Sequence, residues 1–307
     1  MTSPKSRDYA GPADLRAMQA LAQALWPKER QFHIGGLAWQ RFEHVGREAD
    51  WATRLWEADG RVVAWGWIYE RDPDLLYFQV DPAFPALVGE VLDWFEGVAR
   101  AAMLNVPVLD LHAARISALS ARGYSAVGSG PFGLLNARDL AILPASTAPE
   151  GMRLRSMADA PDPERRAAAH RAAWDRIAGR ENDPPGASRV TAESYRAVMA
   201  AWPYRPDLDL VLEDAEGRWV ANCCAWLDPV NGVGELEPVG VDADHRRQGL
   251  GQAVCLAALH SLRAVGAKGA IVGARGDDDY PVPRQLYFSL GFETYARTVT
   301  FERERGW

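Results

Sequence analysis

The chain repeats one order of predicted secondary-structure elements, and this repeat restricts its fold more than any other feature. Each half is predicted to contain, in this order, one or two helices, two or three strands, a longer helix, a strand and a short helix. The short helix ends at Gly123 in the first half and at Gly291 in the second. Glycine is typical of a helix C-terminus, because it adopts left-handed backbone angles without strain. In the second half, Thr191 is the expected N-cap of the second helix, the third strand is expected over residues 233–241, and a last strand over residues 294–304 is expected to close the set. Helices and strands mixed in both halves predict an α/β or α+β fold and an internal duplication.

A linker separates the two halves. The segment LPASTAPEG, residues 143–151, is made of small residues and prolines and has no apolar periodicity, which is typical of an interdomain connection. We therefore expect one domain over residues 1–142 and a second over residues 152–307. The chain has 307 residues and is 48% hydrophobic, so each half can build a core.

The composition argues against several classes of protein. A formal net charge of -7 makes the chain a poor match for nucleic acid or an anionic membrane. The three cysteines, Cys223, Cys224 and Cys255, do not suit a disulfide framework, and we expect them to be small buried side chains. The N-terminus has no apolar signal region and no segment approaches a membrane span, so we expect a cytoplasmic protein.

The segment EPVGVDADHRRQGLGQAV, residues 237–254, carries the strongest chemical signal. A predicted strand ends at Val241, a polar turn follows, and the run RRQGLG, residues 246–251, leads into a predicted helix. The first N–H groups of a helix are unpaired and carry positive partial charge. Glycines there let a phosphate approach the backbone, and two arginines add charge and donors. The segment therefore predicts a pyrophosphate cradle.

Other phosphate-binding loops fit this segment less well. The P-loop pattern GxxxxGK[ST] is absent, and GLGQAV lacks the third glycine of a dinucleotide fingerprint. RRQGLG instead resembles the [RQ]-x-x-G-x-[GA] acetyl-CoA motif of the GNAT acetyltransferases. A second segment, LYFSLGFE, residues 286–293, resembles the L-Y-x-x-x-G-F signature of that family. The resemblance covers about residues 151–307.

The resemblance implies two tandem acyl-CoA N-acyltransferase (GNAT) domains, each a mixed central sheet flanked by helices, a layout that mycothiol synthases share. The first half matches in layout only. At the place of the RRQGLG run it reads FQVDPAFPALVGEV, without an arginine-rich glycine loop and with Pro85 near the turn. We therefore expect a degenerate first domain that does not bind coenzyme A.

The resemblance also implies acetyl-CoA as the cofactor and direct transfer of acetyl to an amine of a small molecule. Backbone N–H groups of residues 248–251 are expected to hold the pyrophosphate, with Arg246 and Arg247 beside it. Val239 and Val241 are expected to pair with the pantetheine arm, and the Val241 N–H to donate to the oxyanion. The expected cofactor-binding residues are Val239, Val241, Arg246, Arg247, Gln248, Gly249, Leu250, Gly251, Gln252 and Tyr287.

Three side chains are candidates for proton transfer. Tyr287 is the expected acid for the departing thiolate, since a thiol has a pKa of about 8.5 and a tyrosine of about 10; alternatively, it only packs on the cofactor. Glu235 and Glu237 lie two apart on one predicted strand, so their side chains face the same way. Either could accept the proton of the amine, and the alternative is a solvated or paired carboxylate.

The sequence departs from the family pattern before Tyr287. The family often has an Asn in the pattern N-x-x-A, where this chain has Tyr280 and Pro283. Asp277, Asp278 and Asp279 lack metal-ligand spacing, so we expect a solvated loop and no metal site. His245 is expected to be a polar loop residue. Five residues could line the acceptor pocket or belong to the core: His170, Trp174, Tyr195, Trp202 and Tyr204.

Two further interpretations stay open at this point. The first is a non-catalytic acyl-CoA-binding module that regulates a partner. The second is an enzyme that takes a longer acyl chain in place of acetyl. The acceptor amine and the oligomeric state do not follow from the sequence.

Overall fold

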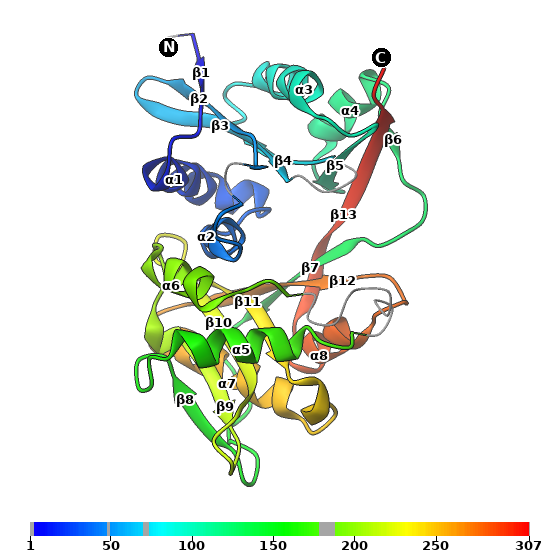
Figure 1. The fold of residues 1–307 in the computed structure, drawn as a ribbon. Coiled ribbons are helices and arrows are strands. Elements are labelled where there is room, and N and C mark those ends of the chain that lie inside the picture. The colour runs from blue at the N-terminus through cyan, green and yellow to red at the C-terminus, as the bar shows by residue number, and fades with distance from the viewer. Residues whose placement is uncertain (1–2, 48–49, 70–73, 178–187, 307) are drawn as a thin grey trace. The chain divides into compact units, whose positions relative to one another are not determined.

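A computed structural model describes residues 3–47, 50–69, 74–177 and 188–306 (Figure 1). The chain divides into two compact units. The first unit contains residues 1–33, 46–132 and 296–307, and the second contains residues 34–45 and 133–295. These units do not correspond to a single cut in the chain, because each half lends a segment to the other unit. The proposed division of the sequence at residues 143–151 stays a prediction about the duplicated halves.

The first unit is a mixed sheet with helices. The strand order is β1-β2-β3-β4-β5-β13, and β6 also pairs with β13. Within it β4 and β5 are parallel and the other pairs antiparallel. The strands are β1 (Lys5–Asp8), β2 (Thr53–Ala58), β3 (Arg61–Tyr69), β4 (Asp74–Val80), β5 (Met103–Leu109), β6 (Ser125–Ala126) and β13 (Glu293–Glu304). The helices are α1 (Pro12–Glu29), α3 (Leu87–Val98) and α4 (Ala113–Ala121).

The second unit is also a mixed sheet, in the order β7-β12-β11-β10-β9-β8. Here β11 and β12 are the parallel pair. The strands are β7 (Gly133–Asp139), β8 (Arg153–Ser156), β9 (Asp209–Glu213), β10 (Trp219–Asp228), β11 (Val233–Val241) and β12 (Gly269–Arg275). The helices are α2 (Ile34–Phe42), α5 (Pro163–Ala173), α6 (Ala192–Ala200), α7 (Leu250–Ala264) and α8 (Val282–Ser289), with short 3-10 turns at Pro206–Leu208 and Ala243–His245.

Two apolar clusters cover opposite faces of the second sheet. On one face, Val254 and Cys255 of α7 and Tyr287 of α8 pack with residues of β9 to β12. On the other face, residues of α2, α5 and α6 pack around Trp226 of β10; Figure 1 shows α5 and α7 beside β9 and β10. A mixed sheet between helices in each unit confirms the predicted fold class.

Local signals place several elements where the sequence predicts them. The predicted N-cap Thr191 is confirmed, since its hydroxyl accepts the N–H of Ser194 at 3.1 Å. The strand β11 has the predicted bounds. Helix α7 begins at Leu250, after Gly249 in the left-handed conformation with φ 77°.

Two features depend on contacts that no local pattern predicts. Helix α2, with the sequence IGGLAWQRF, is absent from the predicted elements because two glycines weaken its helical signal. The last strand, expected to close the second half, pairs with β5 of the first unit over residues 298–304. Phe301 thereby lies opposite Val106, and both side chains are buried. In the second unit β7 pairs antiparallel with β12.

Candidate active site

The strands β11 and β12 pair over only a short stretch. Their parallel register joins Val233–Glu235 to Gly269–Ile271, so among the described residues the rest of β11 has a strand partner only on the β10 side. The Asp242 N–H donates to the Val220 carbonyl of β10 at 2.9 Å. Because backbone groups alternate in direction along a strand, the N–H groups of Val239 and Val241 face the opposite, unpaired edge.

This unpaired edge leads directly into the start of α7. Arg247 and Gly249 adopt left-handed backbone angles, with φ 64° and 77°, and turn the chain into the helix. A Cβ added at Gly249 would meet nothing within 4 Å, so this position is open to a ligand. A Cβ at Gly251 would lie 3.3 Å from Leu286 and 3.4 Å from Val241, so glycine lets α7 begin close against β11 and α8. An open loop at a helix N-terminus suits a phosphate.

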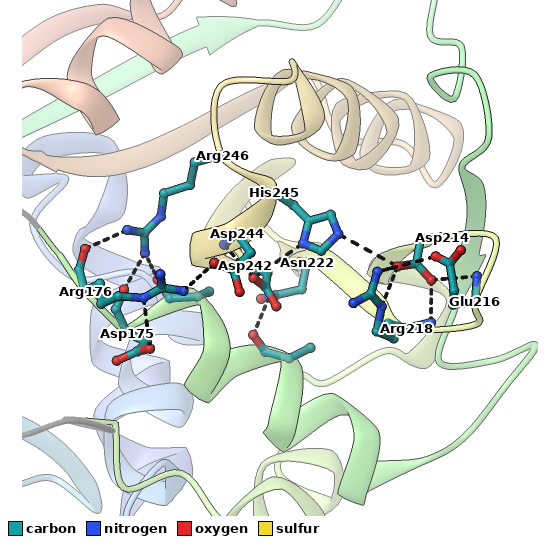
Figure 2. A network of polar contacts seen from close by, with 12 residues as sticks. Asp175, Arg176, Asp214, Glu216, Arg218, Asn222, Asp242, Asp244, His245 and Arg246 are labelled. Atoms are coloured by element: carbon teal, nitrogen blue, oxygen red, sulfur yellow. Dashed lines mark hydrogen bonds and ion pairs between the residues drawn. The ribbon is translucent and has the colours of Figure 1, made fainter.

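The Arg246 side chain binds the C-terminal end of α5 (Figure 2). Its guanidinium donates to the carbonyl oxygens of Ala173 at 3.0 Å, Asp175 at 2.7 Å and Arg176 at 2.7 Å. These carbonyls include groups that lack a partner within the helix. A second link joins the same segments, since Arg176 and Asp244 form an ion pair at 2.7 Å. The loop before α7 is thereby anchored to α5.

The other residues of the loop have different surroundings. Arg247 is exposed and has no hydrogen-bond or ion-pair partner among the residues that the structure describes. His245 lies between two carboxylates, 3.4 Å from Asp242 and 3.8 Å from Asp214 (Figure 2). His245 is thus a polar loop residue, and the two adjacent arginines of the motif are not equivalent.

Tyr287 lies buried on α8, with its ring 6.0 Å from that of Phe292. Burial raises its pKa well above the ordinary value, and the neighbouring Cys255 and Glu237 raise it further. The hydroxyl therefore holds its proton throughout the physiological range. Val239 and Val241 pack against the apolar cluster that contains Tyr287, so the Tyr287 ring lies beside the strand that carries Glu237.

The carboxylate pair on β11 is held from two directions. The Gly36 N–H of α2 donates to Oε2 of Glu235 at 2.6 Å. The Trp226 indole N–H donates to the Glu237 backbone carbonyl at 2.5 Å. Burial raises the pKa of Glu237 to about 8, and the charges of Glu235 and Glu43 contribute to this rise. A carboxylate with this pKa is a stronger base than an ordinary glutamate.

Trp174 and His170 extend from α5 toward β11. Their rings stack with centroids 4.1 Å apart and an interplanar angle of 13°. A Cβ added at Gly240 would lie 2.4 Å from the Ala173 Cβ and 2.8 Å from the Trp174 ring, so glycine lets α5 contact the strand between Val239 and Val241. Burial lowers the pKa of His170 well below its ordinary value, with Arg166 the largest contributor among its charged neighbours. Trp174 therefore packs on the face of β11 at Gly240.

The other predicted acceptor residues lie deeper or apart. The hydroxyls of Tyr195 and Tyr204 both donate to the Asp209 carboxylate, which also pairs with Arg166 at 2.9 Å. Tyr195, Arg166 and Asp209 are fully buried, so this cluster belongs to the core beneath the site. Trp202 is half-buried.

Helix α2 and Glu43, which follows it, supply residues that no sequence motif indicates. The Trp39 ring lies 5.3 Å from that of His170, and Glu43 interacts with Glu237. The adjacent glycines at 35 and 36 were the available signal, because paired glycines often mark a close approach between two elements.

The cysteines and the acidic loop have structural surroundings. All three cysteines are free and buried, as predicted. In the acidic loop Asp277 pairs with Arg275 at 2.5 Å, while Arg284 contacts Asp278 and the Asp277 carbonyl. Among the described residues no group of three or more His, Cys, Asp or Glu side chains could hold a metal ion. Across the same residues every helix is too short or too polar to traverse a lipid bilayer.

The first unit differs at the corresponding positions. Leu119 stands four residues before Gly123, where Tyr287 stands four residues before Gly291, and Leu119 is fully buried. Arg115 of α4 lies over the Phe78 ring at 5.2 Å and forms a buried ion pair with Glu29 at 2.5 Å. Helix α3 begins without a preceding Arg or Gly. The first unit thus lacks the groups that distinguish the second.

One part of this chain matches a known protein family. Residues 174–292, which lie within the second unit, match the model of the Acetyltransferase (GNAT) family. The chain as a whole has the fold of a solved tandem GNAT protein.

Its curated relatives are named mycothiol acetyltransferase. The protein from Saccharomonospora viridis is 32% identical over 186 residues, which cover 55% of this chain and 58% of that one. The protein from Thermomonospora curvata is 31% identical over 161 residues, 52% of this chain and 50% of that one. The chain thus spans about half the length of the curated relatives it matches.

Solved structures share the fold over nearly the whole chain. A tandem GNAT protein from the clavulanic acid biosynthesis pathway has a TM-score of 0.66 at 17% identity and covers 99% of both chains. A GCN5-related N-acetyltransferase from Sphaerobacter thermophilus has a TM-score of 0.61 at 21% identity, covering 98% of this chain and 96% of that one.

Proposed function

We propose that this chain is an N-acetyltransferase that transfers acetyl from acetyl-CoA directly to an amine of a small molecule. One observation carries the proposal: the unpaired edge of β11 runs into the open Gly249 loop, with Glu237 and Tyr287 beside it. A site that held only a phosphate would need the loop alone.

Two parts of the second unit would hold acetyl-CoA. The N–H groups of residues 248–251 and the exposed Arg247 would hold the pyrophosphate, and Gln252 would add a donor in the first turn of α7. The backbone of Val239 and Val241 would pair with the pantetheine arm. When bound, acetyl-CoA would supply an acetyl group activated as a thioester. Arg246 would act indirectly, because its donors are engaged by the carbonyls of α5.

Three groups of the chain would carry the proton and charge movements. Glu237, directly or through water, would accept the proton that the acceptor amine loses, because its raised pKa brings it close to that of an amine. The Val241 N–H would donate a hydrogen bond where negative charge develops. Tyr287 would donate its proton toward the thiolate, and its buried ring would exclude water there.

The charges in the site support an amine acceptor. Glu235 and Glu43 both act on Glu237 through their negative charge, and this charge favours a group that arrives as an ammonium ion. The name of the curated relatives makes a mycothiol-related amine the first acceptor to assay.

A thiol-release assay with acetyl-CoA and a panel of small amines tests the proposal. Amine-dependent thiol release that disappears in Glu237→Gln would support it. Tight binding of acetyl-CoA without turnover of any amine would instead indicate the alternative, a non-catalytic acyl-CoA-binding module. Turnover of a longer acyl-CoA in preference to acetyl-CoA would change the proposed donor.

A further inference from the structure

Helix α2 comes from the N-terminal half of the sequence but belongs to the second unit. Gly36 is the third residue of this helix, so its N–H is one of the first four that have no acceptor within the helix. It donates to Oε2 of Glu235 at 2.6 Å, the distance of a charge-assisted hydrogen bond. Glu235 therefore caps α2, and in return the helix holds the Glu235 carboxylate in place.

The two glycines make this contact sterically possible. A Cβ at Gly35 would lie 2.2 Å from the Trp226 Cβ, and a Cβ at Gly36 would lie 3.0 and 3.1 Å from the two Glu235 carboxylate oxygens. Trp226 in turn donates to the Glu237 carbonyl. Gly35 thus lies against Trp226, which holds Glu237, and Gly36 lies against Glu235 itself. A side chain at either position would displace its neighbour.

We propose that Gly36 is a positioning residue of the acetyl-transfer site, which holds the Glu235 carboxylate beside the base Glu237. The inference rests on the proposed function and deepens it, because it makes a segment of the N-terminal half a working part of the second unit. Glu235 and Glu43 raise the pKa of Glu237 through their charges. The other titratable groups that interact with Glu237 are Cys224 of β10 and Tyr287 of α8. Gly36 acts on Glu237 through Glu235.

The direct test follows the titration of Glu237 by NMR in the full chain with isotope-labelled glutamate, and Glu237→Gln identifies its signal. The parent is expected to titrate at about 8. Glu235→Gln removes the charge and is expected to lower this value by about one pH unit. Gly36→Ala is expected to lower it by less, because the added Cβ pushes the carboxylate toward solvent.

Two further variants separate position from charge and from folding. Glu235→Asp keeps the charge but withdraws it from Gly36, so we expect it to lower the pKa of Glu237 as Gly36→Ala does. It therefore tests the position of the carboxylate even if Gly36→Ala folds poorly. Gly97→Ala is the matched control, since Gly97 lies near the end of α3 and an added Cβ meets nothing within 4 Å. It is expected to match the parent.

Acetyl transfer provides the second readout. In Gly36→Ala we expect kcat to fall about tenfold with an unchanged KM for acetyl-CoA, and the acid limb of the pH profile to move with the Glu237 titration. A titration and pH profile identical to the parent's in Gly36→Ala and Glu235→Asp would overturn the inference, as would a Glu237 titration insensitive to Glu235→Gln. If the parent transfers acetyl to no amine, the proposed function fails, while the NMR titration still decides whether Gly36 positions Glu235.

Discussion

The Arg246 guanidinium donates to the Ala173 carbonyl oxygen at 3.0 Å, and it thereby ties the loop before α7 to the end of α5. Arg247, the next residue, is exposed. The same residue type therefore serves two purposes at adjacent positions: one side chain builds the loop and the other is available to a phosphate.

Substitution of each arginine should separate these purposes. Arg247→Gln should weaken acetyl-CoA binding by about tenfold, the loss of one charge-assisted contact, without lowering the melting temperature. Arg246→Gln should lower the free energy of unfolding by about 1–3 kcal/mol, because three carbonyls lose their donor. Calorimetry and thermal melting of both variants measure this. Equal losses of stability in the two would contradict the assignment.

Gly249→Glu should abolish acetyl-CoA binding. The new side chain would place negative charge where the pyrophosphate is expected, at a position that is open in the structure. Gly266→Glu is the matched control, because Gly266 also has a positive φ and nothing within 4 Å of an added Cβ. It should show the same backbone strain and bind normally. Normal binding by the Gly249 variant would refute the site.

Tyr287→Phe should retain acetyl-CoA binding and lower kcat by about 100-fold or more, the usual contribution of a general acid. Phenylalanine keeps the buried ring and removes only the hydroxyl, so packing against Phe292 should persist. Tyr280→Phe serves as the comparison on the preceding loop and should keep parental kcat. Unchanged turnover in Tyr287→Phe would mean that Tyr287 only packs.

The pKa of Glu237 predicts two pH dependences with a defined sign. Activity should rise with pH and level off above about 8, because the base must be ionised. In the unfolded chain Glu237 ionises near 4.5, whereas in the folded chain it ionises at about 8. The protonated form of Glu237 therefore contributes its whole stabilisation below the unfolded-state pKa. This stabilisation is lost as the pH rises from that value through the folded-state pKa of about 8.

Glu237→Gln should remove that dependence, since glutamine does not ionise. We compare the free energy of unfolding of the variant with that of the parent at each pH. As the pH rises from acidic values to about 9, this difference should shift in favour of the variant by about 1–3 kcal/mol, after allowance for solvent screening. Urea unfolding at several pH values measures the difference. A parallel pH dependence in the two proteins would show that Glu237 is not perturbed.

Gly240→Ala should disturb the contact between α5 and β11. The added Cβ would lie 2.4 Å from the Ala173 Cβ, and such overpacking costs about 1–3 kcal/mol. We expect a lower melting temperature and weaker acetyl-CoA binding, because the strand edge at Val239 and Val241 would shift. Gly273→Ala in β12, where nothing lies within 4 Å, should be neutral.

Elements with strong local signals were predictable from the sequence. The alternation in β11 and the cap at Thr191 depend on residues close in the chain, and the structure matches them. The strand that pairs with β13 could not be predicted, because the pairing places Phe301 opposite Val106, a residue far away in the sequence. Helix α2 contains two glycines that weaken its helical propensity. Its stability depends on tertiary contacts, because Gly35 packs against Trp226 and the Gly36 N–H donates to Glu235.

The candidate site was predictable to the same extent. The motif residues 246–251 and Tyr287 follow from the sequence pattern and come together around β11. The different surroundings of Arg246 and Arg247 could not be predicted, because they depend on where α5 ends. The contact of Gly36 with Glu235 joins positions from opposite halves of the sequence, so no local pattern contains it.

Calorimetric titration of acetyl-CoA into the purified chain tests the central claim most directly. Because the second unit has the glycine loop and Tyr287 while the first has Leu119 at the matching position, we predict one site per chain, lost in Gly249→Glu. Two sites per chain, or no binding at all, would contradict the account.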